Sequence, residues 1–138
     1  MTIVYLALGS NLGQREEHLS EARSRLQDHG ARLLRSSHVV ESEPFGVADQ
    51  PPFLNQVVEA EWNGSPRELL DAAKQVEHEV GRSPSFRWGP REIDVDILLF
   101  GDRRLQEPDL VIPHPGLRDR AFVRERLAEL RPDILEDQ

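Results

Sequence analysis

The sequence predicts an α+β fold in which helices pack on one face of an antiparallel sheet. Two observations lead to this class. Segments of strand and helix character follow in the order strand, helix, strand, strand, helix, strand, and neither a repeat nor a linker divides them. With 138 residues, 38% apolar and 30% charged, the chain has the size and composition of one globular domain. We therefore expect a single domain over residues 1–138.

The first half of the chain supplies three strands and a helix. Residues 2–8 are β-branched and apolar and predict a strand, followed by a turn at 9–13. Residues 14–29 carry apolar side chains at helical spacing. Residues 33–43 and 53–62 have strand character and lie on either side of a proline-containing loop.

The second half begins with the strongest helix signal. Residues 65–81 start with a serine N-cap, a proline in the first turn and a capping-box glutamate, and they end at a glycine. Residues 92–100 are the clearest strand, and residues 117–130 predict a last helix. This order of elements is that of the split βαβ, or ferredoxin-like, unit, with both main helices on one face of the sheet and loops on the other.

Charge and composition exclude several classes of function. The formal net charge of −8 argues against a large nucleic-acid-binding surface. No apolar run approaches the roughly 18 residues needed to cross a bilayer. The chain has no cysteine, so it has neither disulfides nor thiolate metal ligands, which fits a reducing compartment. We expect a cytoplasmic monomer without a nucleic-acid or membrane partner.

The strand at residues 92–100 carries the most specific chemical signal. Asp94 and Asp96 alternate with apolar residues, so both carboxylates point to one face. Two neighbouring acids repel each other, and a bound cation removes that cost. Oxygen ligands without histidine or cysteine favour Mg²⁺ over Zn²⁺. On spacing alone, a solvated strand face with two surface acids is an equal alternative.

Basic residues flank this strand. Arg82, Arg87 and Arg91 lie in the loop that enters it, next to Trp88. Arginine forks bind phosphate oxygens, so arginines beside paired aspartates suit a magnesium nucleotide. Alternatively, these arginines pair with the excess of acidic residues. His114, between two prolines, can contact a phosphate or cap a turn.

These residues form a recognisable pattern. Residues 87–98, RWGPREIDVDIL, resemble the signature of the 6-hydroxymethyl-7,8-dihydropterin pyrophosphokinase family of folate biosynthesis. Similar blocks extend over almost the whole chain, in the family's order: Ala7–Gly13, Phe53–Asn55, Glu77, Gly81–Arg82, Ile112–Pro115 and Arg120–Val123.

The resemblance implies a ferredoxin-like enzyme that transfers pyrophosphate from ATP to the pterin hydroxymethyl group and releases AMP. It implies two Mg²⁺ ions held by Asp94 and Asp96. The residues implied to contact or position ATP are Arg82, Arg91, His114 and Arg120, with Glu77 and Ile97 along the nucleotide site and Arg87 and Trp88 on a closing loop. The residues implied to bind the pterin are Asn55 at the ring edge, Phe53 and Phe122 above and below it, and Ser42 and Phe45 lining the pocket.

The chain departs from the family pattern at several positions. The loop between Arg82 and Arg87 is one residue short, and Asp109 and Val111 stand where basic residues and threonine occur. Arg124 and Arg126 occupy positions where we expect an apolar residue and proline. Two other functions remain open: a metal-dependent phosphohydrolase that uses the same acids, and a non-catalytic ligand-binding module on this common fold.

Overall fold

The computed structural model describes residues 1–42, 52–81, 92–117 and 120–135. The strands are β1 (Thr2–Ser10), β2 (Arg32–Ser36), β3 (Val40–Ser42), β4 (Phe53–Trp62), β5 (Asp94–Phe100), β6 (Leu105–Glu107) and β7 (Leu110–Ile112). The α-helices are α1 (Arg15–Asp28), α2 (Pro66–Val80) and α3 (Ala121–Leu130), with 3-10 turns at Pro115–Leu117 and Pro132–Leu135.

The central sheet is antiparallel, as predicted. Its strands lie in the order β2-β4-β1-β5, and β3 pairs with β4 as well. Strands β6 and β7 form a separate hairpin. Among the described segments, β1 and β4 are the inner strands of the sheet. Their pairing registers determine which residues from different strands lie side by side in a row across the sheet.

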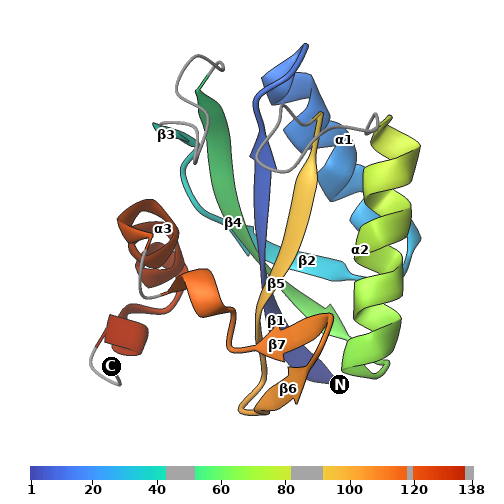
Figure 1. Cartoon of the computed structure of the whole chain (residues 1–138), viewed down its shortest axis with the longest axis vertical. Coiled ribbons are helices and arrows are strands. Elements are labelled where there is room, and N and C mark those ends of the chain that lie inside the picture. Colours follow the sequence, from blue (N-terminus) through green and yellow to red (C-terminus); the bar gives the residue numbers. More distant parts are fainter. Residues whose placement is uncertain (43–51, 82–91, 118–119, 136–138) are drawn as a thin grey trace.

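Helices α1 and α2 cover one face of the sheet, which agrees with the predicted fold class (Figure 1). Leu19, Leu26, Leu69 and Val76 of these helices pack with Leu6 and other strand residues in the larger apolar core. Burying apolar side chains of this kind supplies the main favourable free energy of folding.

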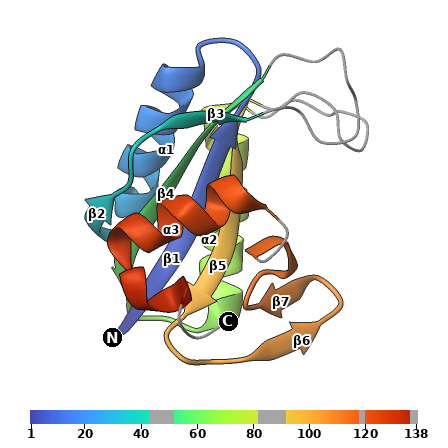
Figure 2. The same cartoon turned by 90° about the vertical axis from the view of Figure 1, so that its left-hand side faces the viewer.

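The sequence predicts only loops on the opposite face of the sheet, and this prediction is wrong. Helix α3 lies across it, on the other side of the sheet from α1 and α2 (Figures 1 and 2). Val123, Leu127 and Leu130 of α3 pack against Tyr5 and Val57 of the sheet. Our last helix was also too long, since residues 115–117 form a separate 3-10 turn and α3 starts only at Ala121.

Three further boundaries differ from the prediction. The expected strand at 33–43 is two strands, because Ser37 between them donates its N–H to the carbonyl of Val57 (2.8 Å) and accepts the N–H of Val57 through Oγ (2.9 Å). Gly9 and Ser10, predicted as part of a turn, continue β1. The β6–β7 hairpin was not predicted.

Helix α2 is specified locally, as the sequence indicated. Ser65 Oγ accepts the N–H of Glu68 (3.1 Å), and Glu68 Oε1 accepts the N–H of Ser65 (2.8 Å). Gly81 ends the helix with φ of 103°, a conformation that costs other residues free energy. Within the described ranges, no helix is long and apolar enough to cross a membrane.

Candidate active site

One row of residues runs across four strands on the face that carries α3. Val40 of β3 pairs with Asn55 of β4, Asn55 pairs with Gly9 of β1, and Gly9 pairs with Asp94 of β5. Paired residues in a sheet point to the same face. The register therefore places the amide of Asn55 and the carboxylate of Asp94 on one face, separated by a residue without a side chain.

The two aspartates share that face, as the alternation predicted. Asp96 pairs with Ala7, the next residue along β1 that points the same way as Gly9. Both aspartates are half-buried, whereas Val95 between them is buried in the core. The two β1 residues that pair with the aspartates, Gly9 and Ala7, are thus both small.

Asn55 is held at the edge of this face by β3. Its Nδ2 donates to Ser42 Oγ at 2.6 Å, so these two predicted pterin-site residues are in direct contact. A Cβ atom at Gly9 would lie 3.4 Å from both Asn55 Oδ1 and Phe53 Cδ1. Glycine at this position therefore allows the amide and the phenyl ring to approach the backbone of β1 closely.

His114 and Arg120 also come together, on the segment that leads into α3. The two side chains flank Gly116, where a Cβ would lie 3.2 Å from His114 Nδ1 and 3.3 Å from Arg120 Nε. The backbone N–H of His114 donates to the carbonyl of Leu98 at 3.0 Å, which attaches this segment to β5.

The environment of His114 favours a neutral imidazole. Burial lowers the pKa of His114 below its usual value, Asp96 opposes the decrease and the charge of Arg120 adds to it. His114 Nδ1 accepts the N–H of Gly116 at 2.9 Å. In the neutral form the proton is therefore on Nε2, which leaves Nε2 as a hydrogen-bond donor.

Glu77 and Ile97 lie elsewhere. Ile97 is buried in the core between the sheet and helices α1 and α2, opposite the face of the two aspartates. Glu77 of α2 is 4% exposed, and its Oε2 accepts the N–H of Val95 at 2.8 Å. Glu77 thus holds the backbone of β5 between Asp94 and Asp96 instead of joining their face.

The remaining predicted residues divide into two sets. Phe53 and Phe122 are half-buried, and Phe122 packs against the smaller core under α3. Five predicted residues lie outside the part of the chain that the structure describes: Phe45, Arg82, Arg87, Trp88 and Arg91.

The donor set fits magnesium. Among the described residues, no group of three or more histidine, cysteine, aspartate or glutamate side chains is arranged to hold a metal. Mg²⁺ binds through one or two carboxylates and completes its shell with water and substrate phosphates. A pair of half-buried aspartates on one strand face therefore suits Mg²⁺ better than Zn²⁺, because Zn²⁺ takes three or four protein ligands.

Sequence reasoning missed the part that Gly9 plays. We interpreted it as a turn glycine, but it lies in a paired strand at the centre of the row. A glycine among apolar strand residues is itself a signal of close backbone approach, and that signal was available.

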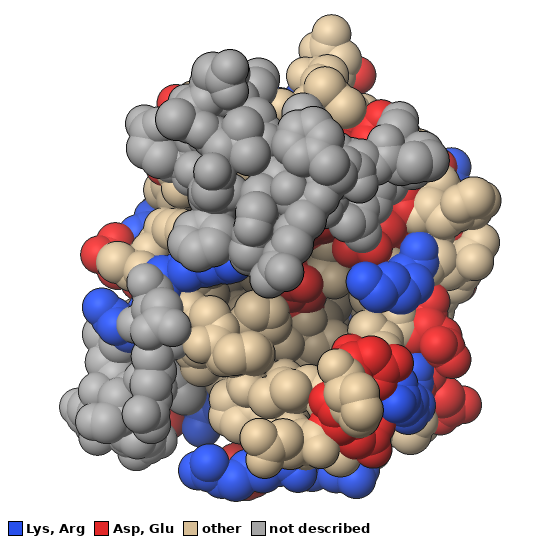
Figure 3. All heavy atoms as spheres, viewed as in Figure 1, with Lys and Arg blue, Asp and Glu red and all other residues tan. Residues whose placement is uncertain are grey.

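On the side of the molecule seen in Figure 3, acidic and basic side chains of the described residues are interspersed.

These features define a ferredoxin-like α+β protein with a row of polar residues on the sheet face that also carries α3. Comparison with known proteins identifies the family. The family model for 7,8-dihydro-6-hydroxymethylpterin-pyrophosphokinase matches residues 5–132. The chain belongs to this pyrophosphokinase family.

Individual relatives agree. The chain is similar to 2-amino-4-hydroxy-6-hydroxymethyldihydropteridine pyrophosphokinase of Bacillus subtilis, with 43% identity over 93% of this chain and 77% of the relative. The protein of the same name from Pseudomonas aeruginosa is 46% identical over 95% of this chain and 82% of the relative. Among solved structures, the Plasmodium falciparum HPPK-DHPS crystal structure with SDX-DHP matches with a TM-score of 0.70 at 15% identity, covering 96% of this chain but 40% of that longer one. This last likeness supports the fold alone.

Proposed function

We propose that this chain transfers pyrophosphate from ATP to 6-hydroxymethyl-7,8-dihydropterin and releases AMP, as a step of folate biosynthesis. The family assignment supports the reaction, and one observation supports its location. The pairing of Gly9 with both Asn55 and Asp94 supports this location, because it brings an amide and a carboxylate, which we propose to read the ring and to bind the metal, to one face of the sheet.

Asp94 and Asp96 are the residues we propose to hold Mg²⁺. Two ions are the number implied by the resemblance to the family. When bound there, magnesium would neutralise phosphate charge and polarise the phosphoryl oxygens. Glu77 acts indirectly, by fixing the N–H of Val95 and with it the spacing of the two acids.

Asn55 is the residue we propose to read the edge of the pterin. Its amide offers both a donor and an acceptor, and Ser42 fixes its orientation. Phe53 and Phe122 are proposed to stack on the two faces of the ring, which suits a flat heterocycle. Phe45, outside the described residues, is proposed to complete this pocket.

His114 and Arg120 are proposed to contact the ATP phosphates. A neutral His114 with its proton on Nε2 donates one hydrogen bond, and Arg120 supplies a positive charge next to it. Four residues outside the described ranges, Arg82, Arg87, Trp88 and Arg91, are proposed to bind the nucleotide or close over it, and Ile97 to support its binding from the core.

The transfer needs positioning more than covalent catalysis. The pterin hydroxyl oxygen bonds to the β-phosphorus, the bond from that phosphorus to the oxygen bridging to the α-phosphorus breaks, and AMP leaves. The hydroxyl proton passes to solvent. We assign no side chain as a general base.

The test is a product assay with purified protein, magnesium, ATP and the pterin. AMP that forms only when the pterin is present supports the proposal. Phosphate release without pterin would favour a hydrolase instead, and binding without any product would favour a ligand-binding module. The absence of cysteine supports the predicted cytoplasmic location, and the net charge of −8 supports the predicted lack of a nucleic-acid partner. The monomeric state remains a prediction. Light scattering checks the oligomeric state.

A further inference from the structure

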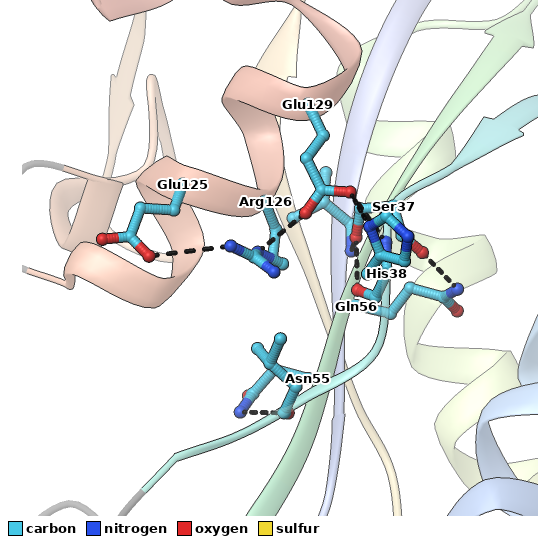
Figure 4. Close-up of polar contacts among 9 residues, drawn as sticks. Ser37, His38, Asn55, Gln56, Glu125, Arg126 and Glu129 are labelled. Atoms are coloured by element: carbon cyan, nitrogen blue, oxygen red, sulfur yellow. Dashed lines mark hydrogen bonds and ion pairs between the residues drawn. The ribbon is translucent and has the colours of Figure 1, made fainter.

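A chain of polar contacts joins α3 to the segment between β2 and β3. Glu129, in the last turn of α3, accepts two hydrogen bonds from His38, one from the backbone N–H at 2.9 Å and one through Nδ1 at 2.8 Å. Figure 4 shows Glu129 pointing from the helix toward this segment. The contact spans 91 residues of sequence, so it is a tertiary link rather than part of a local turn.

Arg126 forms an ion pair with Glu129 from the other side. Arg126 Nε lies 3.0 Å from Glu129 Oε2, and the arginine side chain is only 18% exposed (Figure 4). The pKa of Glu129 is held below its usual range, first by the backbone N–H of His38 and further by the His38 side chain and the charge of Arg126. The family pattern led us to expect proline at position 126, and in this chain an arginine there forms the ion pair.

The segment that Glu129 contacts is locked to β4 next to Asn55. Gln56 Nε2 donates to the carbonyl of Ser37 at 2.9 Å, and Ser37 exchanges two further hydrogen bonds with Val57. Gln56 is 7% exposed, so this attachment is buried. Two residues beyond His38, β3 begins.

The other end of the same link reaches Asn55. Val40 pairs with Asn55, and Ser42 at the end of β3 accepts the Asn55 amide at 2.6 Å. Phe122, which we propose as the other wall of the pterin pocket, lies on α3. Glu129 therefore connects the helix that carries Phe122 to the short strand that orients Asn55.

We propose that Glu129, fixed by Arg126, is a positioning residue for the pterin: it sets the distance between the two walls of the pocket. The inference rests on the proposed function. It requires that loss of Glu129 weakens pterin binding more than nucleotide binding, because His114 and the aspartates proposed to bind metal are attached to β5, on the far side of β1 from β4, whereas Arg120 at the start of α3 is shared with the helix. A purely structural role would lower stability and leave the affinities of the folded protein unchanged.

The test compares Glu129→Ala with Glu125→Ala in the full chain. Glu125 lies one turn earlier on α3, is 63% exposed and meets Arg126 at 3.6 Å, so it is a matched control on the same helix. Calorimetry measures the affinity for α,β-methylene-ATP with magnesium, and then the affinity for the pterin with that analogue saturating. We expect about a five- to tenfold weaker pterin affinity in Glu129→Ala, the size of one or two lost hydrogen bonds, and a clearly smaller loss of nucleotide affinity.

Glu129→Gln provides the rescue. Its amide oxygen still accepts the N–H of His38, so its pterin affinity should lie between those of wild type and Glu129→Ala. If Glu129→Ala does not fold, Glu129→Gln and Glu125→Ala carry the comparison. Equal pterin affinities in wild type and the Glu129 variants, or equal losses for both ligands, would overturn the inference and leave the function intact. Wild-type protein that binds no pterin would refute both.

Discussion

Tyr5 should keep its proton far above the usual range and make stability depend on alkaline pH. Its hydroxyl donates to Glu59 Oε2 at 2.5 Å, and both side chains are buried. Glu59 also accepts two hydrogen bonds from Arg35, which in turn donates to the carbonyl of Leu130 at 2.6 Å. Burial, followed by the hydrogen bond to Glu59, raises the pKa of Tyr5 from 10.0 to about 12.

The sign and size of the effect follow from linkage. The unfolded chain loses the tyrosine proton near pH 10, while the folded chain retains it to about pH 12. The favourable contribution is therefore complete below pH 10 and is lost as the pH rises through 12. A difference of 2 pKa units at 1.36 kcal/mol each makes the loss about 2.7 kcal/mol.

The assay is direct because the chain has one tyrosine. Tyrosinate absorbance should appear near pH 12 in the native protein and near pH 10 in urea. Urea unfolding of Tyr5→Phe should lack the alkaline loss that wild type shows, and near neutral pH the variant should be less stable by about 1.5 kcal/mol. A native tyrosine that ionises near pH 10, or equal alkaline slopes in the two proteins, would refute the reasoning.

The other predictions concern the site. Asp94→Asn and Asp96→Asn should each abolish pterin-dependent AMP formation without changing the circular dichroism spectrum; near-normal turnover in either would sink the magnesium assignment. Asn55→Ala should weaken pterin binding, measured by calorimetry, far more than nucleotide binding, and comparable losses would contradict its role. Glu77→Ala should lower the free energy of unfolding in urea by about 1–3 kcal/mol because it leaves the buried N–H of Val95 unpaired, whereas Glu77→Gln keeps an acceptor and should cost less.

Local signals in the sequence predicted local structure. The capping box of α2 closes over residues 65–68, so the start of that helix depends on no distant contact. The alternation of residues 93–97 likewise fixed which side chains of β5 face the core. The order of elements and the shared face of the two aspartates followed from such signals.

Features that depend on distant partners escaped prediction. The break between β2 and β3 follows from hydrogen bonds of Ser37 to β4, twenty residues away. Asp109, unexpected within the family pattern, binds Arg67 through two hydrogen bonds of 2.7 and 2.8 Å that join the β6–β7 hairpin to α2. The spacing of residues around Ser37 and Asp109 does not indicate that their partners are Val57 and Arg67.

The position of the site follows from how α3 divides one face of the sheet. Arg35, Glu59 and Tyr5 form a row by strand pairing, and this row holds the last turn of α3 through Leu130. Gly9 lies four residues farther along β1, about 13 Å at the rise of a strand, and points to the same face. The helix is thus fixed to a row of bulky and charged side chains, while the row through Gly9 carries no side chain between Asn55 and Asp94. Because the two rows are separate, changes at Tyr5 should act mainly on stability and changes in the row of Gly9 directly on binding.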